Sequence, residues 1–523
     1  MGVHRSSTAR APRGGASRAR RTVRALTTLW VTVAVGFGAA LIAPATAAAA
    51  EPAQSISPPT GPLHTDGTRI VDEYGRTVLV HGVNNVDKGG DGESRARELV
   101  VSGDGFTITP RDAELLAGYG FNAVRLGVSF AGLMPERGRI DHAYIGRVVG
   151  MVDMLAAHGI RTLLDNHQDG LSPVWGGNGF PPWSIAARPL PGEPNPGFPL
   201  YYLMPSMNAG WDEVWNNDNG VLDRLGEALG ALAGAVRGHD GAMGIELLNE
   251  PWPGTAAPTC FPVGCPGFDS RYQSALESLT ADVRAQNPDI PVYWEPNVTW
   301  NQLMPSKLGA ARPITDAGIV FAPHDYCIPS QTSIYLSDSG GSADLTGLCP
   351  VQQDHTWANI DAFAARTRLP TVVTEFGDGD PAVLGNTLRN ADERFAGWFY
   401  WHYSSTRGAG YTEPDPFAAP GPPGQASVGR HLVRTYPQAT AGMPLSMDFD
   451  IESGAFRYTY EPGARAQEPG PAGETLIYVS SLHYPDGYVA EVDGGSVTST
   501  PGARYLTVRA AGSGPVTVRV HGR

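Results

Sequence analysis

Residues 144–169 read YIGRVVGMVDMLAAHGIRTLLDNHQD, and this stretch holds the pattern that decides the fold. Tyr144 to His158 has apolar residues at helical spacing, and Arg161 to Asn166 has the short apolar run of a buried strand. A strand that follows a helix and ends in polar residues is typical of one β/α repeat with a functional edge. Other segments between residues 77 and 401 repeat this alternation.

Eight strand candidates alternate with helical segments between residues 77 and 401. The predicted strands are Thr77–Val83, Ala123–Val128, Arg161–Asn166, Gly244–Asn249, Val292–Glu295, Ile319–Tyr326, Thr371–Glu375 and Ala396–Trp401. The predicted helices are Pro110–Tyr119, Tyr144–His158, Val221–Arg237, Arg271–Gln286, Trp357–Arg368 and Pro381–Arg394. Eight β/α repeats predict an α/β fold, a (β/α)8 TIM barrel. A doubly wound sheet is disfavoured because the first strand lacks a glycine-rich phosphate turn.

Composition divides the chain into three parts. Residues 1–50 contain seven arginines, no acid, an apolar stretch and a run of small residues, which predicts an export signal cleaved near residue 50, by either the Sec or the Tat route. We expect residues 51–436 to form the barrel. Residues 437–523 contain short alternating strands such as Phe456–Tyr460, which predict a small C-terminal β-sandwich.

Charge and cysteine content exclude some classes of function for this chain. The 523 residues carry 38 Lys and Arg against 52 Asp and Glu, and seven of the arginines lie in the predicted signal. So acidic a mature protein is unsuited to nucleic acid or to electrostatic binding of anionic membranes. Four cysteines in an exported chain indicate two disulfides, and short separations favour Cys260–Cys265 and Cys327–Cys349. A zinc site is disfavoured because no C-x-x-C pair or histidine cluster accompanies them.

Polar residues gather where the predicted strands end, and a barrel places those ends around one active site. The strand ends supply Asp165, His167, Asp169, Asn249, Glu250, His324, Tyr326, Glu375 and Trp401, while Arg125 lies within the second strand. Two glutamates on different strands are what a glycosidase needs, one as acid and one on the opposite side of the sugar. Glu295 also faces this pocket in the predicted register, as a structural or binding carboxylate.

The motifs Asn249-Glu250-Pro251 and Thr374-Glu375-Phe376-Gly377 resemble those of glycoside hydrolase family 5. Eight residues match the family pattern in order: Arg125, His167, Asn249, Glu250, His324, Tyr326, Glu375 and Trp401. The resemblance implies a retaining mechanism with Glu250 as acid/base and Glu375 as nucleophile. It also implies that Arg125 and Tyr326 keep Glu375 ionised, and that this charge raises the pKa of Glu250.

Further segments resemble the endoglycoceramidase branch of the family, among them Asp165-Asn166-His167-Gln168-Asp169 and Gly177-Asn178-Gly179-Phe180-Pro181-Pro182-Trp183. That resemblance implies hydrolysis between a glycan and ceramide, with Lys88, Asp165 and Asp169 on the sugars nearest the lipid. The long aromatic segment 167–218, including Trp183, is expected to form an apolar cleft wall. A polysaccharide endoglucanase, a glycosidase for steryl or other apolar aglycones, a metal-dependent hydrolase and a non-catalytic carbohydrate-binding barrel remain alternatives.

The expected partner is a glycolipid or oligosaccharide substrate. The sequence predicts no cofactor, no metal and no nucleic acid. We expect a secreted monomer that makes at most transient contact with lipid surfaces or micelles.

Overall fold

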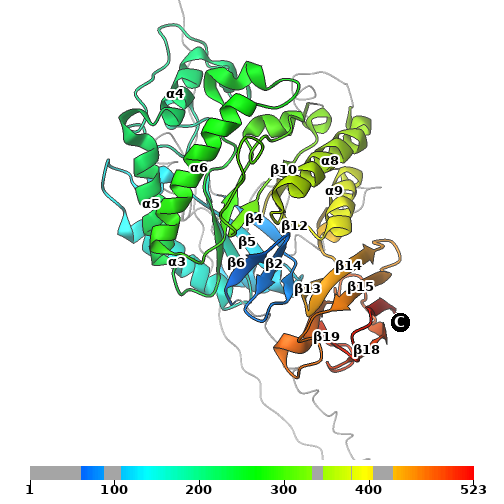
Figure 1. The fold of residues 1–523 in the computed structure, drawn as a ribbon. Helices are drawn as coiled ribbons and strands as arrows, with labels where there is room; N and C mark the ends of the chain where they lie inside the picture. The colour runs from blue at the N-terminus through cyan, green and yellow to red at the C-terminus, as the bar shows by residue number, and fades with distance from the viewer. Residues whose placement is uncertain (1–60, 87–107, 333–344, 379, 404–427) are drawn as a thin grey trace, which may run out of the picture. The chain divides into compact units, whose positions relative to one another are not determined.

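The computed structural model describes residues 61–86, 108–332, 345–378, 380–403 and 428–523 (Figure 1). The predicted export signal and Lys88 lie outside these residues. Within them, no helix combines the length and the apolar character that crossing a membrane requires.

A closed parallel barrel forms the larger part of the described chain. Its strands are β4 (His81–Asn85), β5 (Ala123–Val128), β6 (Arg161–Asn166), β7 (Ala242–Glu246), β8 (Val292–Trp294), β9 (Ile319–Phe321), β10 (His324–Asp325), β11 (Val372–Phe376) and β12 (Gly397–Tyr400). From β4 to β9 and from β10 to β12, each strand pairs in parallel with the next, and β12 pairs with β4. A bridge between Phe321 and Thr371 closes the ring. The predicted TIM barrel is confirmed.

The predicted sixth strand is divided into β9 and β10. Pro323 separates them, and a proline has no N–H for a strand ladder, so the pairing is interrupted there. Taken as one strand, β9 and β10 make the barrel eight-stranded over the described residues. The carboxyl-terminal piece, β10, brings His324 beside Glu375 of β11.

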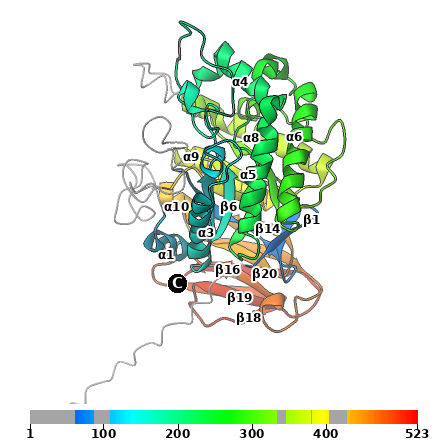
Figure 2. The ribbon, with the colours of Figure 1, turned by 90° about the vertical axis from the view of Figure 1, so that its left-hand side faces the viewer.

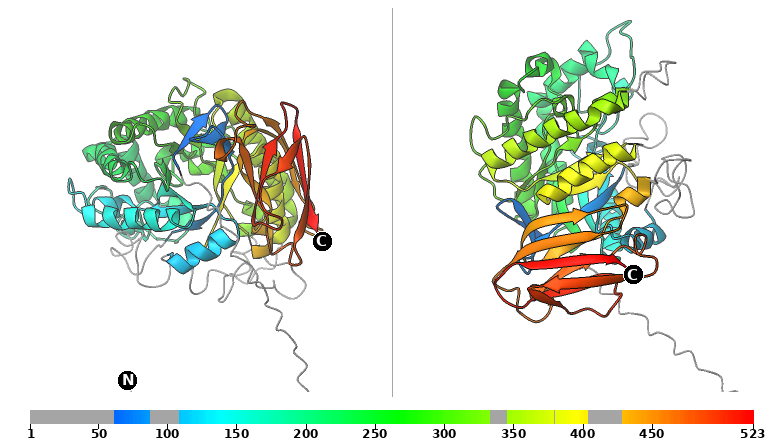
Figure 3. Two further views of the ribbon diagram at one scale, coloured as in Figure 1. Left: turned by 90° about the horizontal axis from the view of Figure 1, so that it is seen from below. Right: turned by 90° about the vertical axis from the view of Figure 1, so that its right-hand side faces the viewer.

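Helices surround the barrel, as the view from below in Figure 3 shows. They are α1 (Pro110–Gly118), α2 (Phe130–Leu133), α3 (His142–Ala156), α4 (Pro205–Trp215), α5 (Val221–Ala235), α6 (Pro266–Gln286), α8 (Cys349–Thr367), α9 (Pro381–Arg394) and α10 (Val428–Leu432). Local sequence sets where they begin. Thr109 and Asp112 form a capping box at α1, and Asp380 caps α9 just before Pro381.

The first three strands do not belong to the barrel sheet. These strands, β1 (Leu63–Asp66), β2 (Arg69–Asp72) and β3 (Thr77–Val78), pair in a seven-stranded sheet with strands from the C-terminal region. The predicted strand Thr77–Val83 therefore divides, because Thr77–Val78 pairs with β13 and only His81 onward enters the barrel. Leu63, Ile70 and Val78 join the apolar cluster that fills the barrel interior.

Two sheets form the C-terminal domain, which confirms the predicted β-sandwich. Its strands are β13 (Tyr436–Thr440), β14 (Gly442–Phe449), β15 (Phe456–Pro462), β16 (Glu474–Tyr478), β17 (Tyr488–Asp493), β18 (Gly495–Val497), β19 (Tyr505–Ala510) and β20 (Val516–Gly522). Figure 2 shows β16, β19 and β18 of one sheet and β20 of the other. Buried side chains of both sheets share one core.

The sandwich packs on the turn between α1 and β5. The Tyr436 ring stacks on His81 of β4 at 3.6 Å between centroids, and its hydroxyl donates to the carbonyl of Gly120 at 2.6 Å. Gln438 donates to the same carbonyl at 3.0 Å, and Tyr478 donates to that of Gly118 at 2.9 Å. These buried polar contacts fix the end of the barrel opposite the carboxyl ends of its strands.

Candidate active site

Arg125 of β5 is the centre of a buried ionic network. Its Nε donates to Glu246 at 2.5 Å and its Nη1 to Glu375 at 2.6 Å. Its Nη2 donates to Asn249 Oδ1 at 2.8 Å and lies 3.1 Å from Asp165. Burial opposes the charge, but the surrounding carboxylates prevail and raise the pKa of Arg125 well above its usual value. The guanidinium therefore remains a fixed cation below the site.

Glu375, in β11, is held through both carboxylate oxygens. Oε1 accepts from Arg125, and Oε2 accepts from the Tyr326 hydroxyl at 2.8 Å. Burial, together with the Glu375 charge, raises the pKa of Tyr326 well above its usual value, so the phenol remains a donor. A carboxylate fixed by a cation and a phenol is oriented as a nucleophile.

Glu250 lies just after β7 and adopts a positive φ of 43°. Its N–H donates to Glu295 Oε2 at 2.8 Å, which stabilises this turn. Its Oε1 accepts from Asn301 Nδ2 at 2.7 Å and lies 2.9 Å from His324 Nδ1. The carboxyl group is therefore positioned from three neighbouring loops and strands.

The predicted rise in the Glu250 pKa is wrong for this geometry. Burial alone would raise it, but the hydrogen bond and charge of His324, with the Asn301 hydrogen bond, lower the pKa below its usual value. The pKa of His324 is raised, because the charges of Glu375 and Glu250 outweigh its burial. Before substrate binds, a proton shared by Glu250 and His324 therefore lies mainly on the imidazole of His324.

The two predicted catalytic carboxyls face one another closely. One carboxylate oxygen each of Glu250 and Glu375, and one ring nitrogen of His324, all lie within 4.8 Å of one another. Retaining glycosidases place their carboxyls about 5–5.5 Å apart, whereas inverting enzymes separate them by about 6.5–9.5 Å to admit a water. The spacing suits direct attack by Glu375.

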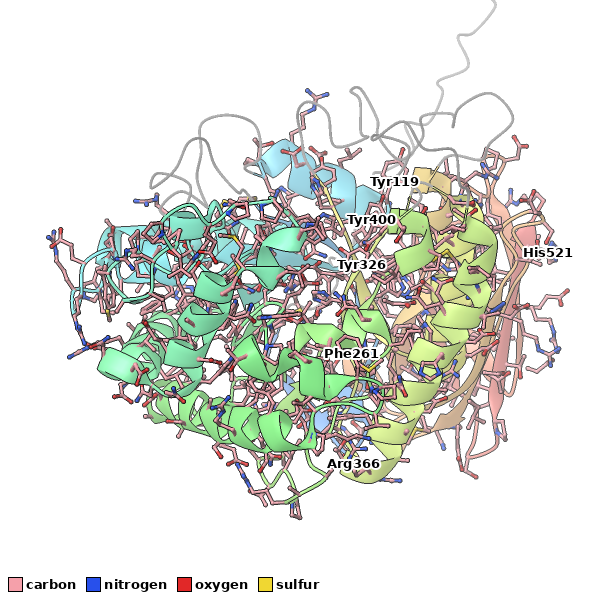
Figure 4. The ribbon with its side chains drawn as sticks, turned by 90° about the horizontal axis from the view of Figure 1, so that it is seen from above. Tyr119, Phe261, Tyr326, Arg366, Tyr400 and His521 are labelled. Carbon is pink, nitrogen blue, oxygen red and sulfur yellow. A yellow bond between two sulfur atoms is a disulfide. The ribbon has the colours of Figure 1, made fainter. Side chains whose placement is uncertain are left out.

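Both glutamates line a cavity of about 580 Å³ at the carboxyl ends of the strands. Its polar part contains His167, Asp169, Asn249, Asn301, Tyr326 and Trp401. Its apolar part contains Phe198, Pro199, Leu200, Leu203, Phe261, Val298 and Ile328. In the view from above, Figure 4 shows Tyr326 and Phe261 within the ring of barrel helices.

His167 connects the ionic network around Arg125 to the polar residues that line the cavity. Its Nδ1 lies 2.8 Å from Asp165, its Nε2 lies 3.4 Å from Asp169, and its ring stacks on Trp401 at 5.6 Å. Burial opposes protonation, but the two aspartates prevail and raise the pKa of His167 to about 9. An imidazolium beside an indole gives this wall several donors and a flat apolar face, as sugar sites require.

Eight of the ten predicted binding residues fall into two groups, while Lys88 lies outside the described residues and Trp183 lies elsewhere. Five of them line the cavity: His167, Asp169, Asn249, Tyr326 and Trp401. Arg125, Asp165 and His324 are buried behind that lining, and Asp165 bonds His167 instead of facing the cavity. Asp165 is thus placed to orient other side chains, which differs from its predicted contact with sugar.

Trp183 lies outside the cavity, contrary to its prediction as a substrate-binding residue. Its indole N–H donates to the carbonyls of Met134 and Pro135, and its ring packs edge-on against Phe130. The Gly-Phe-Pro-Pro-Trp sequence turns this side chain toward α2. The cleft wall comes instead from the later part of the same segment, around Phe198 to Leu203.

The cysteines form the two disulfides that their spacing favours, Cys260–Cys265 and Cys327–Cys349. Thiolates for zinc are therefore absent from these four positions. The first disulfide closes a short loop that carries Phe261, a residue of the cavity wall.

Sequence reasoning missed Glu246 and Asn301. Glu246 of β7 is fully buried, bonds Arg125 and accepts from Thr374 at 3.0 Å. The sequence feature that could have revealed Glu246 was an acidic residue within the otherwise apolar run Gly244–Leu248. Burial and the neighbouring acids Glu246 and Glu250 raise the pKa of Glu295 well above its usual value, so Glu295 acts as a structural carboxyl below Glu250.

The alternative of a metal-dependent hydrolase has Asp165, His167, Asp169, His324 and Asp325 as candidate ligands, and the structure does not bring all five together. Asp325 accepts from Trp357 at 2.9 Å and Thr387 at 2.7 Å, among the helices outside the barrel. Adjacent residues of a strand point to opposite faces, so Asp325 turns away when His324 turns in. Asp165 and Asp169 each lie against His167, and His324 lies against Glu250.

Comparison with known proteins agrees with the site. Residues 73–407 match Cellulase (glycosyl hydrolase family 5), and residues 434–520 match the glycoside hydrolase family 5 C-terminal domain. The chain belongs to glycoside hydrolase family 5 and is a glycoside hydrolase.

The chain is also similar to individual proteins and solved structures of this family. The chain is 60% identical over 466 residues to Endoglycoceramidase I of Rhodococcus hoagii (strain 103S), covering 88% of this chain and 89% of the relative. It is similar to the solved structure of endo-glycoceramidase II from Rhodococcus sp. in complex with ganglioside GM3, with a TM-score of 0.72, 27% identity, and coverage of 88% and 100%. A lactosyl-enzyme intermediate of that Rhodococcus enzyme matches with a TM-score of 0.69, 27% identity, and coverage of 87% and 99%.

Proposed function

We propose that this glycoside hydrolase cleaves the β-linkage between the glycan and the ceramide of glycosphingolipids, with retention of configuration. The observation that carries the proposal is the pair Glu250 and Glu375, with carboxylate oxygens within 4.8 Å, in a cavity lined by both polar and large apolar side chains. The relatives named endoglycoceramidase support the same substrate class.

The reaction takes two displacements. Glu250 gives its proton to the glycosidic oxygen while a Glu375 oxygen attacks the anomeric carbon, so the C–O bond to ceramide breaks and a glycosyl ester forms. Glu250, now a carboxylate, takes a proton from water, whose oxygen attacks the same carbon and releases Glu375. His324 holds Glu250 in place and exchanges a proton with it.

The cavity walls match the two halves of a glycolipid. His167, Asp169, Asn249 and Trp401 offer charge, hydrogen bonds and a flat ring to the sugars next to the bond. Phe198, Leu200, Leu203 and Phe261 offer an apolar wall to the ceramide chains. Lys88 is proposed as a further sugar contact on the family resemblance alone.

Product analysis tests the proposal. Purified protein, with Glu250→Gln and Glu375→Gln variants alongside, is incubated with a detergent-dispersed ganglioside and with a soluble β-glucan. We expect intact oligosaccharide and ceramide from the ganglioside, lost in both variants. Shortened glucan alone would move the protein to the polysaccharide branch, and activity that survives Glu375→Gln would exclude double displacement.

We also propose that the protein is exported and monomeric. The basic and apolar residues 1–50, followed by small residues, support export, as do the two disulfides. N-terminal sequencing of protein recovered from the culture medium should begin near residue 51, and size-exclusion chromatography with light scattering should give the monomer mass.

A further inference from the structure

Glu295 follows strand β8 and contacts the backbone of the acid/base residue. Its side chain is 3% exposed, and its Oε2 accepts from the Glu250 N–H at 2.8 Å. Its backbone carbonyl accepts from the Tyr272 hydroxyl at 2.9 Å, which ties the end of β8 to helix α6. The carboxyl group is therefore held on one side, while its second oxygen points elsewhere.

The second oxygen of Glu295 faces the imidazole of His324. Oε1 lies 3.5 Å from His324 Nε2, while Nδ1 of the same ring lies 2.9 Å from Glu250 Oε1. The His324 side chain is fully buried, and its Nε2 has no hydrogen-bond partner among the described residues. An unpaired buried N–H is costly, and contacts in an empty active site often shorten when substrate binds. The imidazole thus lies between two carboxyl groups, one at each nitrogen.

The hydrogen on Nε2 decides what Nδ1 can do. In the proposed reaction a proton passes from His324 Nδ1 to Glu250 Oε1, and the neutral imidazole that remains carries its hydrogen on Nε2. The hydrogen bond made at one ring nitrogen sets which tautomer is present. An acceptor at Nε2 therefore favours the form of His324 that exchanges a proton with Glu250.

Titratable groups of several elements face Glu295 and His324. They are Arg125 of β5, Glu246 of β7, Glu250 after β7, Tyr272 of α6, Tyr326 after β10 and Glu375 of β11. Burial and the charges of Glu246 and Glu250 raise the pKa of Glu295, so its carboxyl is neutral. A carboxylate oxygen of Glu246 lies within 4.8 Å of both groups, so the Glu295 proton can face Glu246 while Oε1 accepts from Nε2. A neutral acceptor orients the imidazole without holding its proton as tightly as a carboxylate would.

We propose that Glu295 is a positioning residue of the reaction, which accepts from His324 Nε2 and from the Glu250 N–H and so keeps the imidazole able to pass its Nδ1 proton to Glu250. This inference rests on the proposed function, because it concerns the acid/base pair of that reaction. Glu295 touches neither substrate nor the reacting atoms and acts through His324 and Glu250.

NMR of the imidazole nitrogens tests the proposal without substrate. Spectra of protein with isotope-labelled histidine are recorded over a range of pH, and the His324 signals are assigned by their loss in His324→Gln. We expect neutral His324 of the parent protein to carry its hydrogen on Nε2. In Glu295→Gln the Glu250 N–H holds the amide oxygen in place of Oε2, so the amide N–H groups face Nε2 and oppose its hydrogen. The pKa of His324 should then fall by about one pH unit, the value of one net hydrogen bond.

Kinetics give a second readout that a merely structural role would not move. In Glu295→Gln, kcat/KM for a detergent-dispersed ganglioside should fall about tenfold, with its basic limb at lower pH. A dinitrophenyl β-lactoside, whose leaving group departs without a proton, should keep the parent kcat/KM. The matched control is Asp325→Asn, a buried carboxyl that faces Trp357 and Thr387, and it should leave the His324 pKa and both rates unchanged.

A parent His324 whose neutral form carries its hydrogen on Nδ1 would overturn the proposal, and this result needs no variant of Glu295 to fold. Equal His324 pKa values in the parent and Glu295→Gln proteins would overturn it as well. Failure of the parent protein to cleave ganglioside would instead tell against the proposed function, and the NMR spectra would still decide the role of Glu295.

Discussion

At the residue scale, His324 controls the acid/base glutamate. Its ring lies 2.9 Å from Glu250 and 3.6 Å from Glu375, and its charge keeps the pKa of Glu250 below the usual value despite burial. The motif around His324 predicted its place in the site. It did not predict this effect, because the sign of the Glu250 shift depends on which of several buried neighbours lies nearest. The partner of Glu246 could not be predicted from the sequence either. An acid within an apolar strand indicates that a buried partner exists, but it does not identify that partner.

Replacing the histidine tests this assignment. His324→Gln keeps a donor near Glu250 but removes the imidazole that holds the proton of the pair. Since the first step needs that proton and the pKa of His324 is raised, the basic limb of the kcat/KM profile should move to lower pH. An unmoved limb, or one displaced to higher pH, would contradict the role given to His324. His239→Gln, on a partly exposed histidine paired with Asp153, should leave the profile unchanged.

At the element scale, local patterns predicted the barrel well and the first strands poorly. Strands β5 and β6 and helix α9 have the predicted bounds, because each carries its own apolar pattern and boundary residues. Strands β1–β3 complete the sheet of the C-terminal domain through β13, more than 350 residues later, and no local pattern encodes that partner. The region predicted to form the barrel began at residue 51. It therefore included these three strands, although they belong to the sheet of the C-terminal domain.

The turn between α1 and β5 shows how the two domains constrain each other. Gly120 has a φ of +85°, and a Cβ there would lie 2.4 Å from the ring of Tyr478. Gly120→Ala should therefore lower the free energy of unfolding by about 2 kcal/mol, since both backbone strain and the clash oppose it. Gly118→Ala, two residues earlier with open space around it, should be neutral or slightly stabilising. Denaturant titration of both variants measures the difference, and equal stabilities would contradict the packing described for this turn.

At the scale of the whole molecule, a network that extends over several barrel strands supports one chemical event. Arg125 of β5 connects Glu246 of β7 to Glu375 of β11, and His324 of β10 connects Glu375 to Glu250. The barrel brings these residues together from positions up to 250 residues apart. The motifs predicted Arg125, Glu250, His324 and Glu375 of this network, but not Glu246. The arrangement places both carboxyls for a retaining reaction in a cavity lined by both polar and large apolar side chains.

The stereochemistry of hydrolysis distinguishes a retaining reaction at Glu250 and Glu375 from an inverting one. Proton NMR spectra recorded during cleavage of a detergent-dispersed ganglioside by the parent protein show which anomer of the released oligosaccharide appears first. The account predicts the β-anomer of the intact oligosaccharide first, with the α-anomer growing only as mutarotation proceeds. An α-anomer that appears first would mean inversion, and would contradict Glu375 as the nucleophile of a double displacement.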